Sequence, residues 1–206
     1  MFDSRLRPLI DPPLNAAGKR LAQTGIGANA ITVTGFAFGL AAAVLIALGA
    51  PLAGLGFVLL NRLADGLDGA VARVNGKTDL GGFLDITLDF FFYGAVPFAF
   101  AVLDPSKNAL AAAALLLSFY ANGASFLAFA IMAEKHGLET DRQGAKSLYY
   151  LGGLAEGAET IALFVLMCLW PSGFALLAWA FAAVCTVSAG ARVLIGVRTL
   201  RRKPTT

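Results

Sequence analysis

Apolar residues occur along this chain in six long runs, at about 28–48, 52–72, 80–103, 109–133, 148–170 and 174–197. Each run is close to the roughly 20 residues that an α-helix needs to cross a bilayer. Most breaks between the runs are short and contain glycine, proline, asparagine or aspartate, which are typical of turns. The pattern predicts an all-α polytopic membrane protein, with six transmembrane helices in one domain over residues 28–200.

The segment before the first run, residues 1–27, is basic and only partly apolar. Its apolar residues outline an interrupted helix face: Leu6, Leu9, Ile10, Leu14, Ala17 and Leu21. This arrangement predicts a juxtamembrane amphipathic segment that lies on the membrane surface. The prolines Pro8, Pro12 and Pro13 leave a plain basic tail as the alternative. A second basic tail follows the last run at 201–206.

Composition and charge place the chain in the membrane and orient it there. Hydrophobic residues make up 58% of the chain and charged residues 14%, whereas soluble domains carry about 25% charged residues. The two cysteines lie in separate apolar runs, which excludes a disulfide framework. Thirteen lysines and arginines fall on one predicted side of the membrane and Lys107 alone on the other. This asymmetry predicts a bacterial-type inner membrane protein with both termini in the cytoplasm, and basic residues placed at run ends predict no nucleic-acid partner.

Four aspartates interrupt the second and third runs: Asp65, Asp68, Asp85 and Asp89. A buried aspartate costs about 2.5–3.5 kcal/mol on insertion scales, so these residues need compensation. The i, i+3 and i, i+4 spacings place each pair on one helix face. The short connection predicts that the two helices are antiparallel neighbours, and a rise of about 1.5 Å per residue then places all four carboxylates at one depth, in the cytosolic half.

Divalent cations are the expected compensation, because the nearby Arg62 and Arg73 are too few for four acids. An all-oxygen ligand set favours Mg²⁺ or Mn²⁺, and shared carboxylates suit a site with two ions. Gly69 and Gly81, close to the aspartates, are expected to leave room for a ligand, with close helix packing as the alternative. At Gly35 and Gly39, which have GxxxG spacing, packing is the expected role.

The residues around the acids form a motif: Asp65-Gly66-Leu67-Asp68-Gly69-Ala70-Val71-Ala72-Arg73, then Gly81, Asp85 and Asp89. It resembles the signature of the CDP-alcohol phosphotransferases, D-x2-D-G-x2-A-R followed by G-x3-D-x3-D. Every fixed residue is present, and only the spacer between Arg73 and Gly81 is slightly shorter than usual. The six predicted spans and the amphipathic start also match that family's architecture.

This resemblance implies a reaction and roles for residues. The donor would be a CDP-alcohol, and CDP-diacylglycerol is the one we expect; a substituted phosphoryl group would pass from it to a second alcohol with release of CMP. Asp65, Asp68, Asp85 and Asp89 would hold two metal ions, and Asp89 would also be the general base. Gly69 would leave space for the nucleotide, Arg73 would pair with its phosphates, and the protein would form a homodimer. Near the nucleotide we also expect Gly81, Asn29 and Thr32, although Asn29 could instead cap its helix.

The acceptor alcohol is less clearly indicated by the sequence. Arg192, in the last run, would suit a phosphorylated acceptor such as glycerol 3-phosphate or an inositol phosphate, which we favour slightly. Free Glu156 or Glu159 would instead suit an amino alcohol such as serine, and pairing of Arg192 with Glu156 would make both structural. Lys135 and Lys146 are weaker acceptor-binding candidates. A small cation transporter or channel is the alternative of another class, since it too could hold four acids in a helical bundle.

Overall fold

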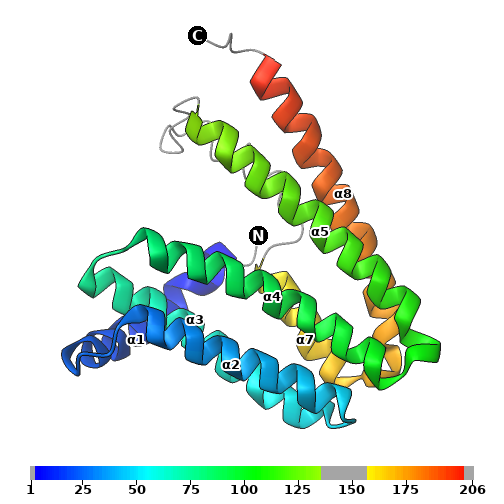
Figure 1. Cartoon of the computed structure of the whole chain (residues 1–206), viewed down its shortest axis with the longest axis horizontal. Coiled ribbons are helices and arrows are strands. Elements are labelled where there is room, and N and C mark those ends of the chain that lie inside the picture. Colours follow the sequence, from blue (N-terminus) through cyan, green and yellow to red (C-terminus); the bar gives the residue numbers. More distant parts are fainter. Residues whose placement is uncertain (1–2, 136–156, 202–206) are drawn as a thin grey trace.

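The computed structural model describes residues 3–135 and 157–201, and these ranges contain helices and no strand (Figure 1). The helices are α1 (Asp3–Gln23), α2 (Ala28–Ala47), α3 (Pro51–Asn75), α4 (Asp79–Leu103), α5 (Pro105–Lys135), α7 (Gly157–Leu169), the short 3₁₀ helix η1 (Pro171–Gly173) and α8 (Phe174–Arg201). The predicted all-α class is therefore confirmed for the described ranges.

Four helices in these ranges are long and apolar enough to cross a membrane: Ala28–Ala47, Asp79–Leu103, Pro105–Lys135 and Pro171–Arg201. Helix α3 is as long as α4, but its apolar stretch contains Arg62, Asp65 and Asp68. Helix α7 covers 13 residues, and the first part of the predicted span at 148–170 lies outside the described residues. The count of six spans therefore stays a prediction.

The helix ends follow the turn residues of the sequence. Gly49 and Gly76 have φ values of 86° and 94°, a conformation that glycine adopts without steric cost. Pro51 and Pro105 begin α3 and α5, where a missing backbone N–H is tolerated. At the start of α5, Asp104 accepts hydrogen bonds from the Ser106 hydroxyl and the Lys107 amide and pairs with the Lys107 ammonium group, which lowers the pKa of Asp104.

Helix α1 packs against the second half of α3. A Cβ atom added at Gly66 would lie 2.6 Å from Leu14 Cδ1, and one added at Gly18 would lie 2.5 Å from Ala70 Cβ. Glycine thus allows a close approach of the two helices at both points. The N-terminal segment is helical through Pro12 and Pro13, and Leu14 of its predicted apolar face contacts α3. Its place on the membrane surface stays a prediction.

The backbone of α2 runs close to those of both α3 and α4, whereas the backbones of α3 and α4 come close to each other at few points. A single apolar cluster joins α2, α3, α4, α5, α7 and α8, with Phe92, Phe100, Phe164 and Phe174 among its fully buried members. Helices α5 and α8 pack along each other and extend away from the α2–α3–α4 group (Figure 1). The apolar cluster starts about one helical turn beyond Asp89, so the polar residues of α3 and α4 gather at the other end of these helices.

Candidate active site

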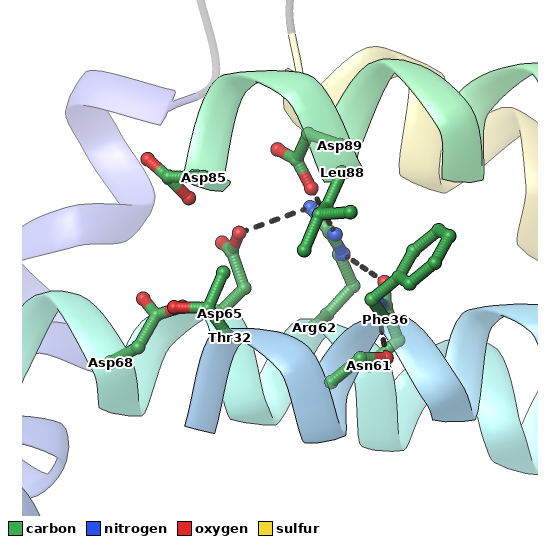
Figure 2. A pocket seen from close by; sticks show the side chains of 10 residues that line it. Thr32, Phe36, Asn61, Arg62, Asp65, Asp68, Asp85, Leu88 and Asp89 are labelled. Carbon is green, nitrogen blue, oxygen red and sulfur yellow. Dashed lines mark hydrogen bonds and ion pairs between the residues drawn. The ribbon is translucent and has the colours of Figure 1, made fainter. Parts of the chain in front are cut away.

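A pocket lies where α2, α3 and α4 meet (Figure 2). All four aspartates of the motif line it, two from α3 and two from α4. The remaining lining residues come from the same three helices and are Thr32, Gly35, Phe36, Asn61, Arg62 and Leu88. The structure thus brings together the four carboxylates that the sequence predicts to share one site.

Three of the carboxylates approach one another closely. One oxygen from each of Asp65, Asp85 and Asp89 lies within 4.8 Å of the others. Asp68 is 7% exposed, and Thr32 of α2 lines the pocket beside it (Figure 2). Four oxygen-bearing acids around one pocket fit a hard divalent cation such as Mg²⁺ or Mn²⁺.

The two aspartate pairs do come together in the pocket. The short connection led us to expect that direct packing of α3 on α4 would bring them together, but it is not what does so. Each of these helices packs instead against α2. The Asn61 side chain on α3 donates a hydrogen bond of 2.8 Å to the Gly35 carbonyl on α2. On α2, a Cβ added at Gly35 would lie 2.8 Å from Ala64 Cβ on α3, and one added at Gly39 would lie 2.6 Å from Phe92 Cδ2 on α4. Packing is therefore the role of both glycines, as predicted.

Arg62 is the positively charged side chain among the described residues that line the pocket. Its Nη2 atom donates to Asp89 Oδ1 at 2.7 Å, and its Nη1 atom lies 3.6 Å from Asp65 Oδ1. Its Nε atom donates to the Asn61 side chain at 2.8 Å. The Tyr93 hydroxyl lies 3.4 Å from both Arg62 Nη1 and Asp89 Oδ2. These contacts join α3 to α4 across the pocket.

The residues expected near the nucleotide lie between the aspartates and the α3–α4 connection, except for Thr32 in the pocket wall. Among the described residues, and leaving out the backbone of its own helix, only Arg73 Nη1 lies within 4 Å of a Cβ added at Gly69, at 3.5 Å. Arg73 donates two hydrogen bonds, of 3.1 and 2.8 Å, to the Asn15 side chain on α1. A Cβ added at Gly81 would lie 3.1 Å from Asn29 Oδ1, so the starts of α2 and α4 are close together. The alternative that Asn29 caps its helix is wrong, because the N-cap is Gly27 and no side chain caps this end.

Of the expected acceptor residues, the structure describes Arg192, Lys135 and Glu159, and these three do not line this pocket. Arg192 on α8 donates to the backbone and side-chain oxygens of Asn122 on α5, at 3.0 and 3.1 Å, and its guanidinium lies 5.3 Å from the Phe126 ring centroid. Lys135 is exposed in the last turn of α5. Lys146 and Glu156 lie outside the described residues, so the pairing of Arg192 with Glu156 stays untested.

Arg62 was expected near the aspartates from the sequence, whereas Asn61, Tyr93 and Asn15 acquire places that the sequence did not assign to them. Asn61 and Tyr93 had local signals, because each lies four positions from a motif aspartate on the same helix. Asn15 had none, because its partner Arg73 is 58 positions away.

Comparisons with known proteins agree with the motif. The family model for CDP-alcohol phosphatidyltransferase matches residues 26–194. Inner membrane protein YnjF of Escherichia coli (strain K12) is 51% identical over 201 residues, which cover 98% of each chain. The archaetidylinositol phosphate synthase of Pyrococcus horikoshii is 39% identical over 101 residues, 48% of this chain and 53% of that protein.

Among solved structures, this fold is similar to the phosphatidylinositol phosphate synthase PgsA1 of Mycobacterium tuberculosis. The TM-score is 0.68 for the structure with CDP-DAG bound, at 23% identity over 89% of this chain and 92% of that one. It is 0.71 for the structure with manganese and citrate, at 22% identity over 89% and 88%. The family match over most of the chain shows that it belongs to the CDP-alcohol phosphatidyltransferase family, whose members are transferases of substituted phosphate groups.

Proposed function

We propose that this protein transfers a phosphatidyl group from CDP-diacylglycerol to a second alcohol and releases CMP. The observation that carries the proposal is the pocket in which Asp65, Asp68, Asp85 and Asp89 converge from two helices. The similar PgsA1 structure with CDP-DAG bound supports this choice of donor. In the transfer, the acceptor oxygen forms a bond to the lipid-side phosphorus, the bond from that phosphorus to the CMP oxygen breaks, and CMP leaves with the electron pair.

The four aspartates would hold the divalent cations, and we propose two Mg²⁺ or Mn²⁺ ions. Three carboxylate oxygens within 4.8 Å of one another, with a fourth carboxylate in the same pocket, fit such a site. Bound cations supply charge stabilisation for the pyrophosphate oxygens as the bond breaks. The PgsA1 structure in complex with manganese supports a divalent metal in this fold.

The chain's own residues would handle the proton and the nucleotide. Asp89 accepts the proton of the acceptor hydroxyl, a role that requires a carboxylate within hydrogen-bonding reach of that hydroxyl. Arg73 pairs with the nucleotide phosphates, and Asn15 holds its guanidinium in place. The space at Gly69 and the polar atoms near Gly81 suit the nucleotide; Asn29 and Thr32 would contact it as well.

For the acceptor, we propose a phosphorylated alcohol such as glycerol 3-phosphate or an inositol phosphate. The name of the Pyrococcus relative, an archaetidylinositol phosphate synthase, supports this class. Arg192 would contact the acceptor phosphate, with Lys135 and Lys146 as further contacts. An amino alcohol such as serine is the competing acceptor, and the experiment below separates the two.

We further propose a six-span arrangement in the inner membrane. Helices α2, α3, α4, α5 and α8 would each cross the bilayer, and the sixth span would include α7. Both termini and the pocket would lie on the cytoplasmic side, with α1 at the membrane surface and the enzyme a homodimer. The name of the half-identical Escherichia coli relative, an inner membrane protein, supports this location.

The test is release of CMP from CDP-diacylglycerol by the purified full chain with Mg²⁺ or Mn²⁺, using a panel of alcohols and identifying the lipid products. We expect activity with a phosphorylated alcohol and its loss in Asp68→Asn. The matched control Asp104→Asn makes the same change outside the pocket and retains a helix-capping side chain, so it should keep wild-type activity. Product formation only with serine would contradict the proposed acceptor. Wild-type CMP release by Asp68→Asn would contradict the proposed site.

A further inference from the structure

Arg62 contacts two of the three aspartates whose oxygens come close enough to share one cation. Its guanidinium lies 2.7 Å from Asp89 and 3.6 Å from Asp65, while Asp85 completes the three. The Arg62 side chain is 18% exposed, compared with 28% for Asp89 and 38% for Asp65. An arginine this well enclosed is poorly screened by water, so its charge acts strongly on both carboxylates.

The guanidinium is held in position from several sides. Asn61 accepts from its Nε atom at 2.8 Å, and the rings of Phe92 and Tyr93 lie 4.9 and 5.6 Å from its central carbon. Cation–π contacts of this kind stabilise a charge away from water. The pocket therefore already contains one fixed positive charge among its four carboxylates.

A divalent cation would have to share Asp65 and Asp89 with this charge. Arg62 repels an incoming cation and also donates to an Asp89 oxygen that would otherwise be a free ligand atom. If Arg62 were only structural, its removal would disturb the pocket and weaken cation binding. If it competes with the cation, its removal would strengthen cation binding.

We propose that Arg62 is an internal counter-cation that competes with the divalent cation for Asp65 and Asp89, and so lowers the affinity of the pocket for that cation. This inference rests on the proposed function, because it takes the aspartate pocket to be a cation site. Arg62 acts through the carboxylates and is a positioning residue, which also stabilises the cation-free pocket by pairing with its acids.

The test uses Mn²⁺ alone, titrated into the detergent-purified full chain after chelation, with free Mn²⁺ counted by electron paramagnetic resonance. Arg62→Met removes the charge and keeps a long apolar side chain against Phe92. We expect this variant to bind Mn²⁺ about tenfold more tightly than the wild type, since close charge pairs are coupled by at least that much. Without Mn²⁺ its unfolding midpoint should fall, and saturating Mn²⁺ should restore most of the loss.

Two further variants separate charge from packing. Arg62→Lys keeps the charge and should bind Mn²⁺ less tightly than Arg62→Met. Arg198→Met removes a charge from the exposed last turn of α8 and should leave the Mn²⁺ affinity close to the wild-type value. If Arg62→Met does not fold, Arg62→Gln, which keeps a hydrogen-bond donor but no charge, has the same expected result.

Weaker or unchanged Mn²⁺ binding in a folded, uncharged Arg62 variant would overturn the inference and leave the proposed cation site intact. A wild-type protein that binds no Mn²⁺ would overturn both the inference and the proposed cation site. CMP release is a separate measurement, so the transferase reaction can fail or hold independently of this result.

Discussion

The separation of the two aspartate pairs depends on how closely α2 approaches α3, and Gly35 is the place to test this. In Gly35→Ala the new Cβ would lie 2.8 Å from Ala64 Cβ, about 0.6 Å short of the 3.4 Å at which ordinary van der Waals contact begins. Ala64 is 6% exposed and its methyl group has no rotamer to change. The two helices must therefore move apart locally.

The expected cost follows from two opposing effects. Overpacking of a well-packed interior costs about 1–3 kcal/mol, and replacing a helical glycine by alanine returns up to about 1 kcal/mol in water. The net loss of stability is therefore about 0–3 kcal/mol. Catalysis should be more sensitive: a 1 Å misplacement can cost about 100-fold, so a shift of about 0.6 Å should lower the rate of CMP release about tenfold.

The assay compares CMP release and thermal unfolding of Gly35→Ala with those of Gly56→Ala. Gly56 lies in α3, and a Cβ added there meets no atom of another described element within 4 Å. This control makes the same chemical change without a steric demand, so it should keep wild-type activity.

A double variant tests whether the contact between residues 35 and 64 causes the loss of activity. Ala64→Gly removes the atom that Gly35→Ala would contact, and the nearest remaining atom would be the Asn61 carbonyl oxygen at 3.6 Å. Activity should therefore return in Gly35→Ala with Ala64→Gly, even though Ala64→Gly alone loses helix stability. If Gly35→Ala behaves like Gly56→Ala, or if the double variant fails to recover, α2 does not control the spacing of the pocket.

Three further predictions concern the proposed roles of single residues. Asp89→Asn should lose turnover and keep most of its affinity for CDP-diacylglycerol, measured by donor binding; an equal fall in both would contradict the role of Asp89 as general base. Asn15→Ala should raise the donor KM severalfold, because Arg73 loses the side chain that holds it, and an unchanged KM would exclude Asn15 from nucleotide binding. Arg192→Ala should raise the acceptor KM by about one to two decades, since a hydrogen bond to a charged group is worth about 1.5–3 kcal/mol. A lower unfolding temperature with unchanged acceptor KM would instead make Arg192 a structural link to Asn122 on α5.

The sequence predicted the helices well because apolar runs and turn residues are local signals. The run at 28–48 became Ala28–Ala47, and the run at 80–103 became Asp79–Leu103. The last helix continues to Arg201, past the predicted run at 174–197, because an exposed basic turn can prolong a helix without being apolar. The four aspartates were placed together correctly, since their spacings fix their helix faces.

Contacts between segments that are far apart in the sequence could not be predicted from the pattern of residues. The short connection between α3 and α4 suggested that these two helices pack on each other. Instead, glycines on α2 let that helix pack against both α3 and α4. The sequence also offered Asp65 as the nearest acid to Arg62, whereas the shorter contact is with Asp89 on another helix. The Asn15–Arg73 contact depends on how α1 fits over Gly18 and Gly66, which no pattern along a single helix reveals.

The position of α2 between the two aspartate-bearing helices has a consequence for how sites of this family can diverge. A Cβ at Gly35 would press on α3, and one at Gly39 would press mainly on Phe92 of α4, so a larger side chain at either position would change how closely α2 approaches the two helices that carry the aspartates. Proteins with an identical aspartate motif can then differ in the cation or acceptor that they accommodate through changes on α2 alone. A comparison of substrate preference across this family should therefore include the sequence of the helix before the motif as well as the motif itself.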